Sequence, residues 1–296
     1  MTLPTSTPIQ ERVWLCMADS NRTRLLSRAL AKGLGMVVYM GPTLDQEGPI
    51  SLVVCDDAHT PRIVEAKKNA APFQKSLLVT AGAKRIAGVD IFLQADTDAG
   101  TIANAVEGLR NYRALEVTLG GKVELDIGAI ASLRSGEFSI QTLDEAREIA
   151  LFIARGCPKS CQMSVGIYTL LANAIEHGNL EFSSNDKAKG LAEGKWRKTL
   201  IQKLGDREFS HRRVRIRCQR GGRVISLIIH DDGPGIDAET SEMANPARSG
   251  YRGKGIKAAR SLGFTQISYL GVGNIVEASV LLSRPAKQDV KVAVAS

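Results

Sequence analysis

The sequence predicts a two-domain α/β protein whose first half is a doubly wound parallel sheet. The chain has 296 residues, enough for two domains that each bury a core. Between residues 12 and 115, short apolar runs alternate with amphipathic stretches, which is typical of buried parallel strands joined by helices. No apolar run reaches the roughly 20 residues that cross a bilayer, and residues 1–10 are a polar tail. We therefore expect a cytoplasmic protein without a membrane span.

In the first half we expect strands at 13–18, 52–55, 77–80 and 89–93, with helices at 22–34, 62–70 and 102–115. Polar side chains follow three of these strands: Asp19, the pair Asp56 and Asp57, and Thr80. Functional groups of a doubly wound sheet gather at the carboxyl ends of its strands. These four residues are therefore the candidate site of the first half.

This arrangement resembles the receiver domain of response regulators. The resemblance implies that Asp19 belongs to an acidic pair that holds magnesium, and that Thr80 is the hydroxyl that senses a phosphoryl group. It also implies an aspartate phosphoacceptor. Strand length favours Asp56 and the distance to Pro61 favours Asp57, so both stay open.

The sequence also departs from the receiver pattern. Gln94 and Ala95 stand where receivers usually have Lys-Pro, and Asp19 is the only acid at the first position. The cation that would neutralise a phosphoryl group is missing, and the magnesium site is short of a ligand. We therefore expect a degenerate receiver-like domain over residues 11–116, which serves either regulated phosphorylation or docking.

Residues 117–136 lose clear periodicity and contain Gly120, Gly121 and Gly136, so we expect a linker there, followed by a second domain over 137–284 and disordered tails at 1–10 and 285–296. The formal net charge of the chain is +8 and most of it lies in the second half, which favours an anionic partner. The five cysteines are scattered and an odd number, so we expect reduced thiols packed as small hydrophobes.

The second domain is predicted to begin with a strand at 138–140 and a helix through about residue 155, which opens with a capping box of Thr142 and Glu145. A second helix at 163–178 is apolar except for one stripe, on which Thr169, Asn173 and Glu176 recur at helical spacing. Taken alone, this stripe is typical of a solvated helix face.

A hairpin over residues 213–230 then delivers Asp231 to a glycine turn that contains Gly233 and Gly235. A carboxylate at a strand end can accept a hydrogen bond from the exocyclic amine of adenine, and glycines let the backbone approach a flat ring. Further along, Arg252, Gly253, Lys254 and Gly255 precede a helical stretch at 257–262, as in a phosphate-binding loop. Strands at 265–270 and 275–282 complete the domain.

Asparagine on a helix, then Asp-x-Gly-x-Gly, then Gly-x-Gly before a helix is the ordered pattern of GHKL ATPases. Two motifs resemble those of the anti-sigma-factor serine kinases: Asn-Ala-Ile-Glu-His-Gly-Asn at 173–179 and Gly-Lys-Gly-Ile-Lys-Ala-Ala-Arg-Ser-Leu-Gly-Phe at 253–264. The resemblance covers about half of the chain. It implies an α+β sandwich with a mixed, largely antiparallel sheet and helices on one face.

The same resemblance implies Mg-ATP as ligand and a sigma factor or an antagonist of an anti-sigma factor as partner. Asn173 would ligate Mg²⁺ and Asp231 would bind the adenine amine. Gly233 and Gly235 would line the base, while Gly253, Lys254 and Gly255 would hold the phosphates, with Arg252 adding positive charge.

Catalysis is the point at which this chain differs from the family. Thr169 stands where these kinases have a glutamate that activates the attacking group, and a threonine hydroxyl is a very poor base. Glu176 is a weak candidate to replace it. We therefore expect a nucleotide binder with slow or absent phosphoryl transfer.

Three alternatives remain open from the sequence. The first is an active protein serine/threonine kinase. The second is a nucleic-acid binder that uses six arginines near the hairpin, although arginines alternating along a strand are more often its solvated face; these are Arg212, Arg213, Arg215, Arg217, Arg220 and Arg223. The third is a docking scaffold, with a homodimer possible. The charged insertion at about 180–213 is either local core or a partner-binding surface.

Overall fold

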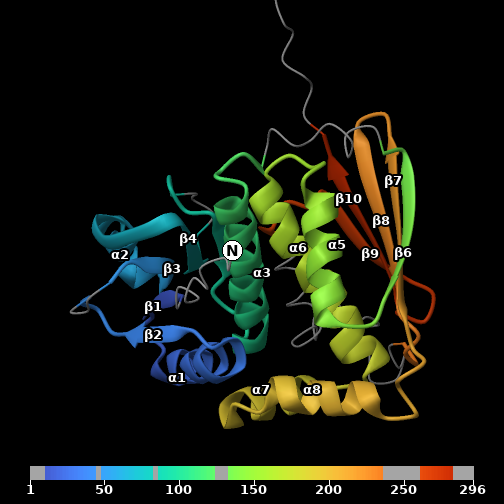
Figure 1. Cartoon of the computed structure of the whole chain (residues 1–296), viewed down its shortest axis with the longest axis horizontal. Coiled ribbons are helices and arrows are strands. Elements are labelled where there is room, and N and C mark those ends of the chain that lie inside the picture. The colour runs from blue at the N-terminus through green and yellow to red at the C-terminus, as the bar shows by residue number, and fades with distance from the viewer. Residues whose placement is uncertain (1–10, 45–47, 83–85, 124–132, 236–260, 283–296) are drawn as a thin grey trace, which may run out of the picture.

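Two five-stranded sheets lie on either side of a central group of helices (Figure 1). The structure is a computed structural model that describes residues 11–44, 48–82, 86–123, 133–235 and 261–282. The predicted tails and the predicted phosphate-binding loop at 252–255 lie outside these residues. No helix in the described ranges combines the length and the apolar character needed to cross a membrane.

The sheet of the first half is parallel throughout, as predicted. Its strand order, β2-β1-β3-β4-β5, is one of the two common orders of doubly wound sheets. The edge strand β2 is absent from the elements predicted above. The strands are β1 (Arg12–Cys16), β2 (Val37–Met40), β3 (Ile50–Asp56), β4 (Ala70–Thr80) and β5 (Ile91–Gln94).

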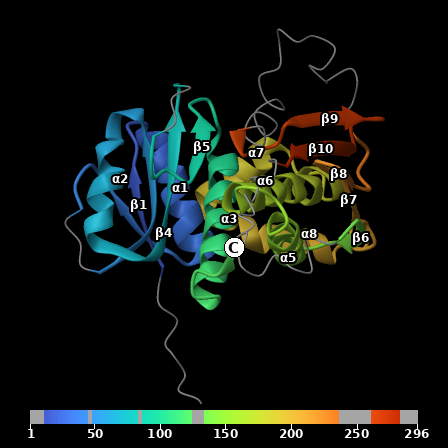
Figure 2. The same cartoon turned by 90° about the horizontal axis from the view of Figure 1, so that it is seen from above.

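Alternate residues of these strands face two different cores. Val13 and Leu15 face α1 (Ser20–Arg28) and α3 (Ala99–Thr118), whereas Trp14 and Cys16 face α2 (Pro61–Ala66) on the other side (Figure 2). In the described parts of the connections between β2 and β3 and between β4 and β5, there is no helix. The sheet is therefore covered mainly by α1 and α3 on the face that looks toward the second half.

The second sheet has the order β6-β7-β8-β10-β9, and all four neighbouring pairs of described strands are antiparallel. The parallel pair that the expected mixed sheet requires is therefore absent among the described strands: β8 and β9 run in the same direction, but β10 lies between them. The strands are β6 (Ser135–Ile140), β7 (Val214–Gly221), β8 (Val224–His230), β9 (Gln266–Leu270) and β10 (Ile275–Leu281).

Helices α5 (Leu143–Ala154) and α6 (Ser160–Asn173) cover one face of this second sheet (Figure 1). The capping box is present: Thr142 Oγ1 accepts from the Glu145 amide, and the Glu145 carboxylate accepts from the Thr142 amide. Helix α6 is buried on nearly all sides because α3 packs against the side that faces away from the sheet. The two halves consequently share one hydrophobic core.

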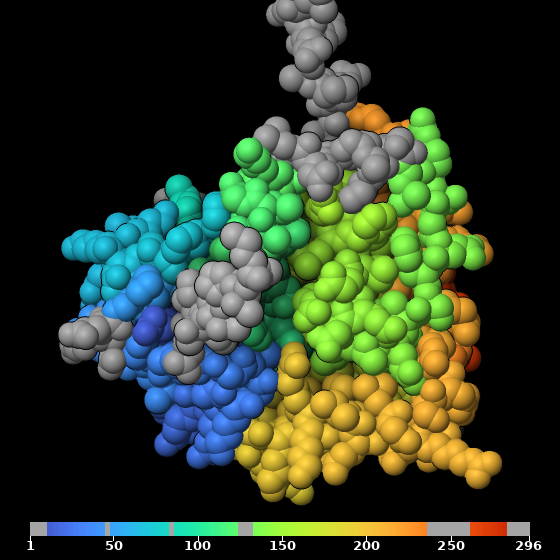
Figure 3. All heavy atoms as spheres, in the orientation of Figure 1, coloured from blue at the N-terminus to red at the C-terminus, as the bar shows by residue number. Residues whose placement is uncertain are grey.

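The charged insertion folds into two helices, α7 (Ser184–Glu193) and α8 (Trp196–Gly205). They run beneath both halves (Figure 1), and the space-filling view places the yellow atoms of this segment against the blue atoms of α1 (Figure 3). The corner at Gly194 touches Lys32, and Arg28 donates to the Ala192 carbonyl, 3.2 Å away. The insertion therefore bridges the two halves rather than serving only as local core of the second.

All five cysteines are free thiols, and four of them are buried, as expected for small core residues. Burial raises the pKa of the Cys157 thiol to about 12 and that of Cys16 to about 11. These thiols are therefore protonated at neutral pH and are poor nucleophiles.

Helices α3 and α6 are in close contact at Gly108. A Cβ atom added there would lie 3.1 Å from the Cα of Val165, which is backbone and cannot turn aside. Nearby, the hydroxyls of Tyr112 and Ser160 are hydrogen-bonded at 2.6 Å, and Gln162 Nε2 donates to the Asp90 carbonyl at 3.0 Å. The contact is therefore specific as well as close.

Replacing Gly108 by leucine tests whether this contact holds the halves together. We expect Gly108→Leu to lower the free energy of unfolding by on the order of 2 kcal/mol, because the larger side chain forces the two helices apart. The control is Gly205→Ala in α8, where an added Cβ meets no atom within 4 Å. The control is expected to change stability by less than about 0.5 kcal/mol. Urea unfolding measures both, and equal stabilities would contradict the prediction.

Candidate functional site

The second half places Asp231 directly after β8, where the neighbouring strand fixes its backbone. The amide of Asp231 donates to the Asn274 carbonyl at 3.1 Å, and Asn274 Nδ2 donates back to the Asp231 carbonyl at 3.3 Å. Asn274 ends the turn before β10, whose first residue, Ile275, pairs with His230. Two adjacent strands therefore determine where the Asp231 side chain begins.

The Asp231 carboxylate lies against the end of the helix that carries Asn173. Asp231 is 8% exposed, and its Oδ1 accepts a hydrogen bond from the Gly233 amide at 3.0 Å. A Cβ atom added to Gly178 would come within 2.4 Å of the Asp231 Cγ, and one added to Gly233 would come equally close to the Gly178 carbonyl oxygen. Only glycine fits at both positions, so the carboxylate faces bare backbone on this side.

Neighbouring carboxyl groups in this turn have opposite electrostatics. Burial raises the pKa of Asp231 from its ordinary value of 3.8 to about 6. Burial also acts on Asp232, but the Arg213 amide at 2.9 Å and the Arg215 guanidinium at 2.5 Å outweigh it and hold the pKa of Asp232 below its ordinary value. Such divergence between adjacent groups is typical of functional sites, although ion pairs in a purely structural role produce it as well.

A π-helical turn, Ala174–Asn179, joins the end of α6 to the Asp231 turn. Its wider i→i+5 spacing is seen in the bond from the Leu180 amide to the Ile175 carbonyl, 2.9 Å. Asn179 is buried, and its Oδ1 accepts from the Asp232 amide at 2.7 Å. The Nδ2 of the same side chain has no partner in the described structure. The π-turn therefore holds the Asp231 turn in place from one side.

Asn173 is the last residue of α6 and is only partly buried. Thr169 lies one helical turn earlier, is 1% exposed, and donates its hydroxyl to the Val165 carbonyl at 2.8 Å. That hydroxyl is engaged within its own helix and has no free role as a base. Asn173 thus immediately precedes the π-turn that contacts the Asp231 turn, and the Thr169 hydroxyl is bonded within its own helix.

The sequence predicted that Glu176 lies on one helical stripe with Thr169 and Asn173. In the structure Glu176 instead belongs to the π-turn that follows Asn173. The π-turn changes the helical register after Asn173, and the Glu176 side chain is fully buried. Its Oε2 is 2.5 Å from Lys187 Nζ, and its Oε1 accepts from Trp196 Nε1 at 3.1 Å. With both oxygens occupied, this carboxylate is unsuited to replace the missing catalytic glutamate.

The remaining nucleotide-binding candidates fall into two groups. Gly233 and Gly235 form the turn after Asp231, and Gly235 has a positive φ of 82° that suits glycine. A Cβ atom there would come within 2.5 Å of the Val272 carbonyl oxygen, so this turn packs against the one between β9 and β10. Arg252, Gly253, Lys254 and Gly255 lie outside the described residues.

At the carboxyl edge of the first sheet, the predicted acids are engaged with nearby backbone. Asp19 caps α1 by accepting from the Asn21 and Arg22 amides, both at 3.0 Å. Asp56 accepts from the Ala18 amide at 2.6 Å and contacts His59 Nδ1 at 2.6 Å.

Asp57 and Thr80 are bonded in the same manner at this edge. Asp57 accepts from the Ala81 amide at 2.9 Å, and Thr80 Oγ1 accepts from the Gly82 amide at 2.9 Å. In the described part of the chain no three His, Cys, Asp or Glu side chains are grouped to hold a metal ion.

The arginines near the hairpin are all bonded within the protein. On β7, Arg215 pairs with Asp232, and Arg217 Nε lies 2.7 Å from a Glu137 oxygen on β6. Arg212 binds the Glu181 carboxylate and the Asn179 carbonyl. The other three, Arg213, Arg220 and Arg223, donate to backbone carbonyls. This pairing favours a solvated strand face over a nucleic-acid surface.

Three residues of the site were given no role by the sequence analysis: Gly178, Asn179 and Asn274. Gly178 and Asn179 lie at the end of the quoted 173–179 motif, where the Gly-Asn pair that closes the predicted helix was the available signal. Asn274 follows a glycine-containing turn 43 residues after Asp231, and nothing local marks it as a partner.

Asp231 and Asp232 are expected to contribute to stability with opposite pH dependence. The folded protein keeps the Asp231 proton up to about pH 6, whereas the unfolded chain loses it near 3.8, so stability falls as pH rises through this window. Asp231→Asn should therefore stabilise the protein by about 1–2 kcal/mol at pH 8 and by almost nothing at pH 4.

Asp232→Asn is the matched control. Its carboxylate has a lowered pKa, so its stabilisation is present above the ordinary value and disappears as pH falls. This variant should be less stable than wild type at pH 8 and similar at acid pH. Thermal unfolding across pH 4–8 measures both, and a destabilised Asp231→Asn protein at pH 8 would show that the charge is not penalised by burial.

Comparison of the chain with protein-family models, with curated proteins and with solved structures gave no match.

Proposed function

We propose that the second half binds Mg-ATP and that the protein regulates a partner protein in signalling. The observation that supports this most directly is the buried Asp231 carboxylate, which lies against the bare backbone of Gly178 and Gly233 at the end of the helix that carries Asn173. Two motifs separated by more than 50 residues in sequence thus meet in one place.

The residues present fit an adenine base. Asp231 uses Oδ1 for the Gly233 amide, which leaves an acceptor oxygen for the exocyclic amine of adenine. Guanine has a carbonyl at the corresponding position and would oppose a carboxylate. A flat ring needs close backbone approach, and Gly233 and Gly235, which follow Asp231 in the chain, are residues without a side chain that would block it.

In this proposal Asn173 ligates Mg²⁺ through its amide oxygen, since magnesium prefers oxygen ligands together with phosphate oxygens. Arg252, Gly253, Lys254 and Gly255 hold the phosphates. The bound metal would neutralise phosphate charge. Asp231 and the π-turn would fix the orientation of the base.

The partner is proposed to be of the sigma-factor type or an antagonist of an anti-sigma factor, as in the family that the motifs resemble. Regulation would follow from nucleotide-dependent binding, with phosphoryl transfer slow or absent. The first half serves as a docking domain in this proposal, with phosphorylation at Asp56 or Asp57 as the alternative. An active serine/threonine kinase is the second candidate function, because the chain has both Asn173 and Asp231 of the motif pattern.

Mg-ATP binding is tested directly by isothermal titration calorimetry. Wild type should bind one Mg-ATP per chain and GTP more weakly. Asp231→Ala should weaken ATP binding by about ten- to a hundredfold, because it removes a charge-assisted hydrogen bond to the base. Asp232→Asn should bind within about threefold of wild type, since its carboxylate is turned toward Arg213 and Arg215. An absence of binding by wild type, or equal binding by Asp231→Ala, would rule out the proposed site.

The missing base predicts how much ADP the protein releases. Wild type should form ADP at close to the background rate, because the Thr169 hydroxyl is buried and bonded to Val165. Thr169→Glu should raise the rate by about a hundredfold or more if the base alone is lacking. Thr169→Gln has the same length without basicity and should stay at the wild-type rate. Rapid turnover by wild type would favour the active kinase instead.

A further inference from the structure

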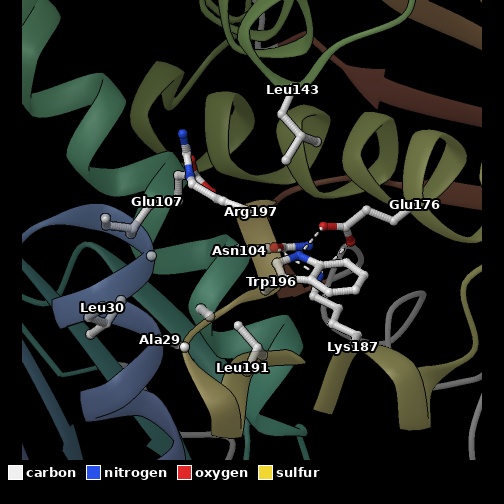
Figure 4. Close-up of a pocket in the computed structure, with 14 residues that line it drawn as sticks. Ala29, Leu30, Asn104, Glu107, Leu143, Glu176, Lys187, Leu191, Trp196 and Arg197 are labelled. Atoms are coloured by element: carbon white, nitrogen blue, oxygen red, sulfur yellow. Dashed lines mark hydrogen bonds and ion pairs between the residues drawn. The ribbon is translucent and has the colours of Figure 1, made fainter. Parts of the chain in front are cut away.

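A small cavity of about 30 Å³ lies where the two halves meet, away from Asp231. It is enclosed by α3 and a π-helical turn, Ala29–Gly33, from the first half, and by α7, α8 and the π-turn Ala174–Asn179 from the second (Figure 4). π-Helical turns are rare and are often found at functional sites. In the described chain both of them line this one cavity.

A buried polar cluster forms one wall of the cavity. Lys187 Nζ of α7 contacts Glu176 Oε2 at 2.5 Å and donates to Asn104 Oδ1 of α3 at 3.0 Å. Trp196 Nε1 of α8 completes the shell of Glu176 at 3.1 Å. Figure 4 shows these four side chains converging from four different elements. We name them the junction cluster: Asn104, Glu176, Lys187 and Trp196.

Each member of the junction cluster is at most 7% exposed, so the charges receive little help from water. A buried ion pair offsets its desolvation only when its geometry is good and its remaining hydrogen-bonding groups are satisfied. Asn104, from the first half, supplies the second acceptor of the Lys187 ammonium. The aliphatic part of Lys187 also packs against α3, 3.3 Å from the position that a Cβ on Gly100 would take. The charge pair of the second half therefore depends on α3.

Glu176 connects the junction cluster to the proposed nucleotide site within one short segment of the chain. It lies in the same six-residue π-turn as Gly178, which touches Asp231, and Asn179, which binds the Asp232 amide. The turn begins immediately after Asn173. Any shift of this turn toward regular α-helical register would move Glu176, Gly178 and Asn179 together.

We propose that the first half regulates nucleotide affinity by holding the π-turn in its present register through the Asn104–Lys187–Glu176 contact. This inference rests on the proposed Mg-ATP site. By thermodynamic linkage, nucleotide binding in turn strengthens the docking of α3 on the second half. A phosphorylation or partner that displaces α3 would thereby lower the affinity for ATP.

The test is the Mg-ATP affinity of full-length Asn104→Leu by titration calorimetry. The leucine is similar in size but accepts no hydrogen bond, so Lys187 loses its bond to the first half. We expect the dissociation constant to rise at least fivefold, the lower end of typical coupling between sites.

The control is Tyr112→Phe, which removes a hydrogen bond to Ser160 between the same pair of halves. Tyr112 lies on the same helix, is as well buried as Asn104, and is not in the junction cluster. The dissociation constant of Tyr112→Phe for Mg-ATP should stay within about twofold of that of wild type.

A second measurement keeps the inference testable should Asn104→Leu fold poorly. In the milder Asn104→Ser variant, amide hydrogen exchange at residues 174–179 should be at least fivefold faster than in wild type, with exchange in β6 unchanged. Unchanged exchange in that variant would overturn the inference.

The outcomes separate the two proposals. Two results would overturn the proposed regulation and leave the nucleotide site standing. In the first, Asn104→Leu binds ATP as tightly as wild type. In the second, Tyr112→Phe weakens ATP binding as much as Asn104→Leu does. A wild-type protein that binds no ATP overturns the proposed function and the inference together.

Discussion

The packing of α6 against α3 is the contact on which most of this structure depends. The side of α6 that faces away from α3 covers the antiparallel sheet, and the side of α3 that faces away from α6 covers the parallel sheet. The two helices therefore form the centre of a single core. The backbones come together because Gly108 has no side chain to separate them. If this contact opened, the apolar faces of α3 and α6 that now pack together would be exposed to water, so the halves are energetically one unit even though each has its own topology.

The candidate site is arranged around the end of the same helix. A π-turn follows Asn173 directly, and its residues face three ways: Glu176 toward the first half, Gly178 toward Asp231, and Asn179 toward the Asp232 amide. Because π-turns pack less well than α-helix, such a turn persists where tertiary contacts stabilise it. Here the contacts come from both halves, which gives the site a physical means of sensing how they are docked.

The sequence was informative where local chemistry decides the outcome. The Thr142 and Glu145 capping box, the hairpin before Asp231 and the parallel strands of the first half are all read from neighbouring residues, and the structure confirms them. Strand β2 was missed because it is four residues long and lies at an edge, with a burial pattern that has no clear alternation. In the second sheet, the β7–β8 and β9–β10 pairs are local hairpins, whereas β6–β7 and β8–β10 join strands far apart in sequence, and periodicity does not encode such pairs.

The position of Glu176 shows why the contacts in the rest of the site could not be predicted from the sequence. Regular α-helical spacing would place it beside Thr169 and Asn173, and only the change of register after Asn173 redirects it. Its partners, Lys187 and Asn104, lie 11 residues after it and on the other half of the chain, respectively. A buried charge has to find its counter-charge in three dimensions, and no spacing rule identifies that residue in advance.

The central position of α3 also has a consequence for biosynthesis. Translation completes α3 well before α6 emerges, so the newly made first half carries an apolar helix face whose natural cover has not yet been synthesised. Domains usually fold in order from the amino terminus, and exposed apolar surface at that stage invites aggregation or capture by chaperones. For this chain, the nascent protein is therefore exposed to aggregation during the time between the synthesis of α3 and the synthesis of α6.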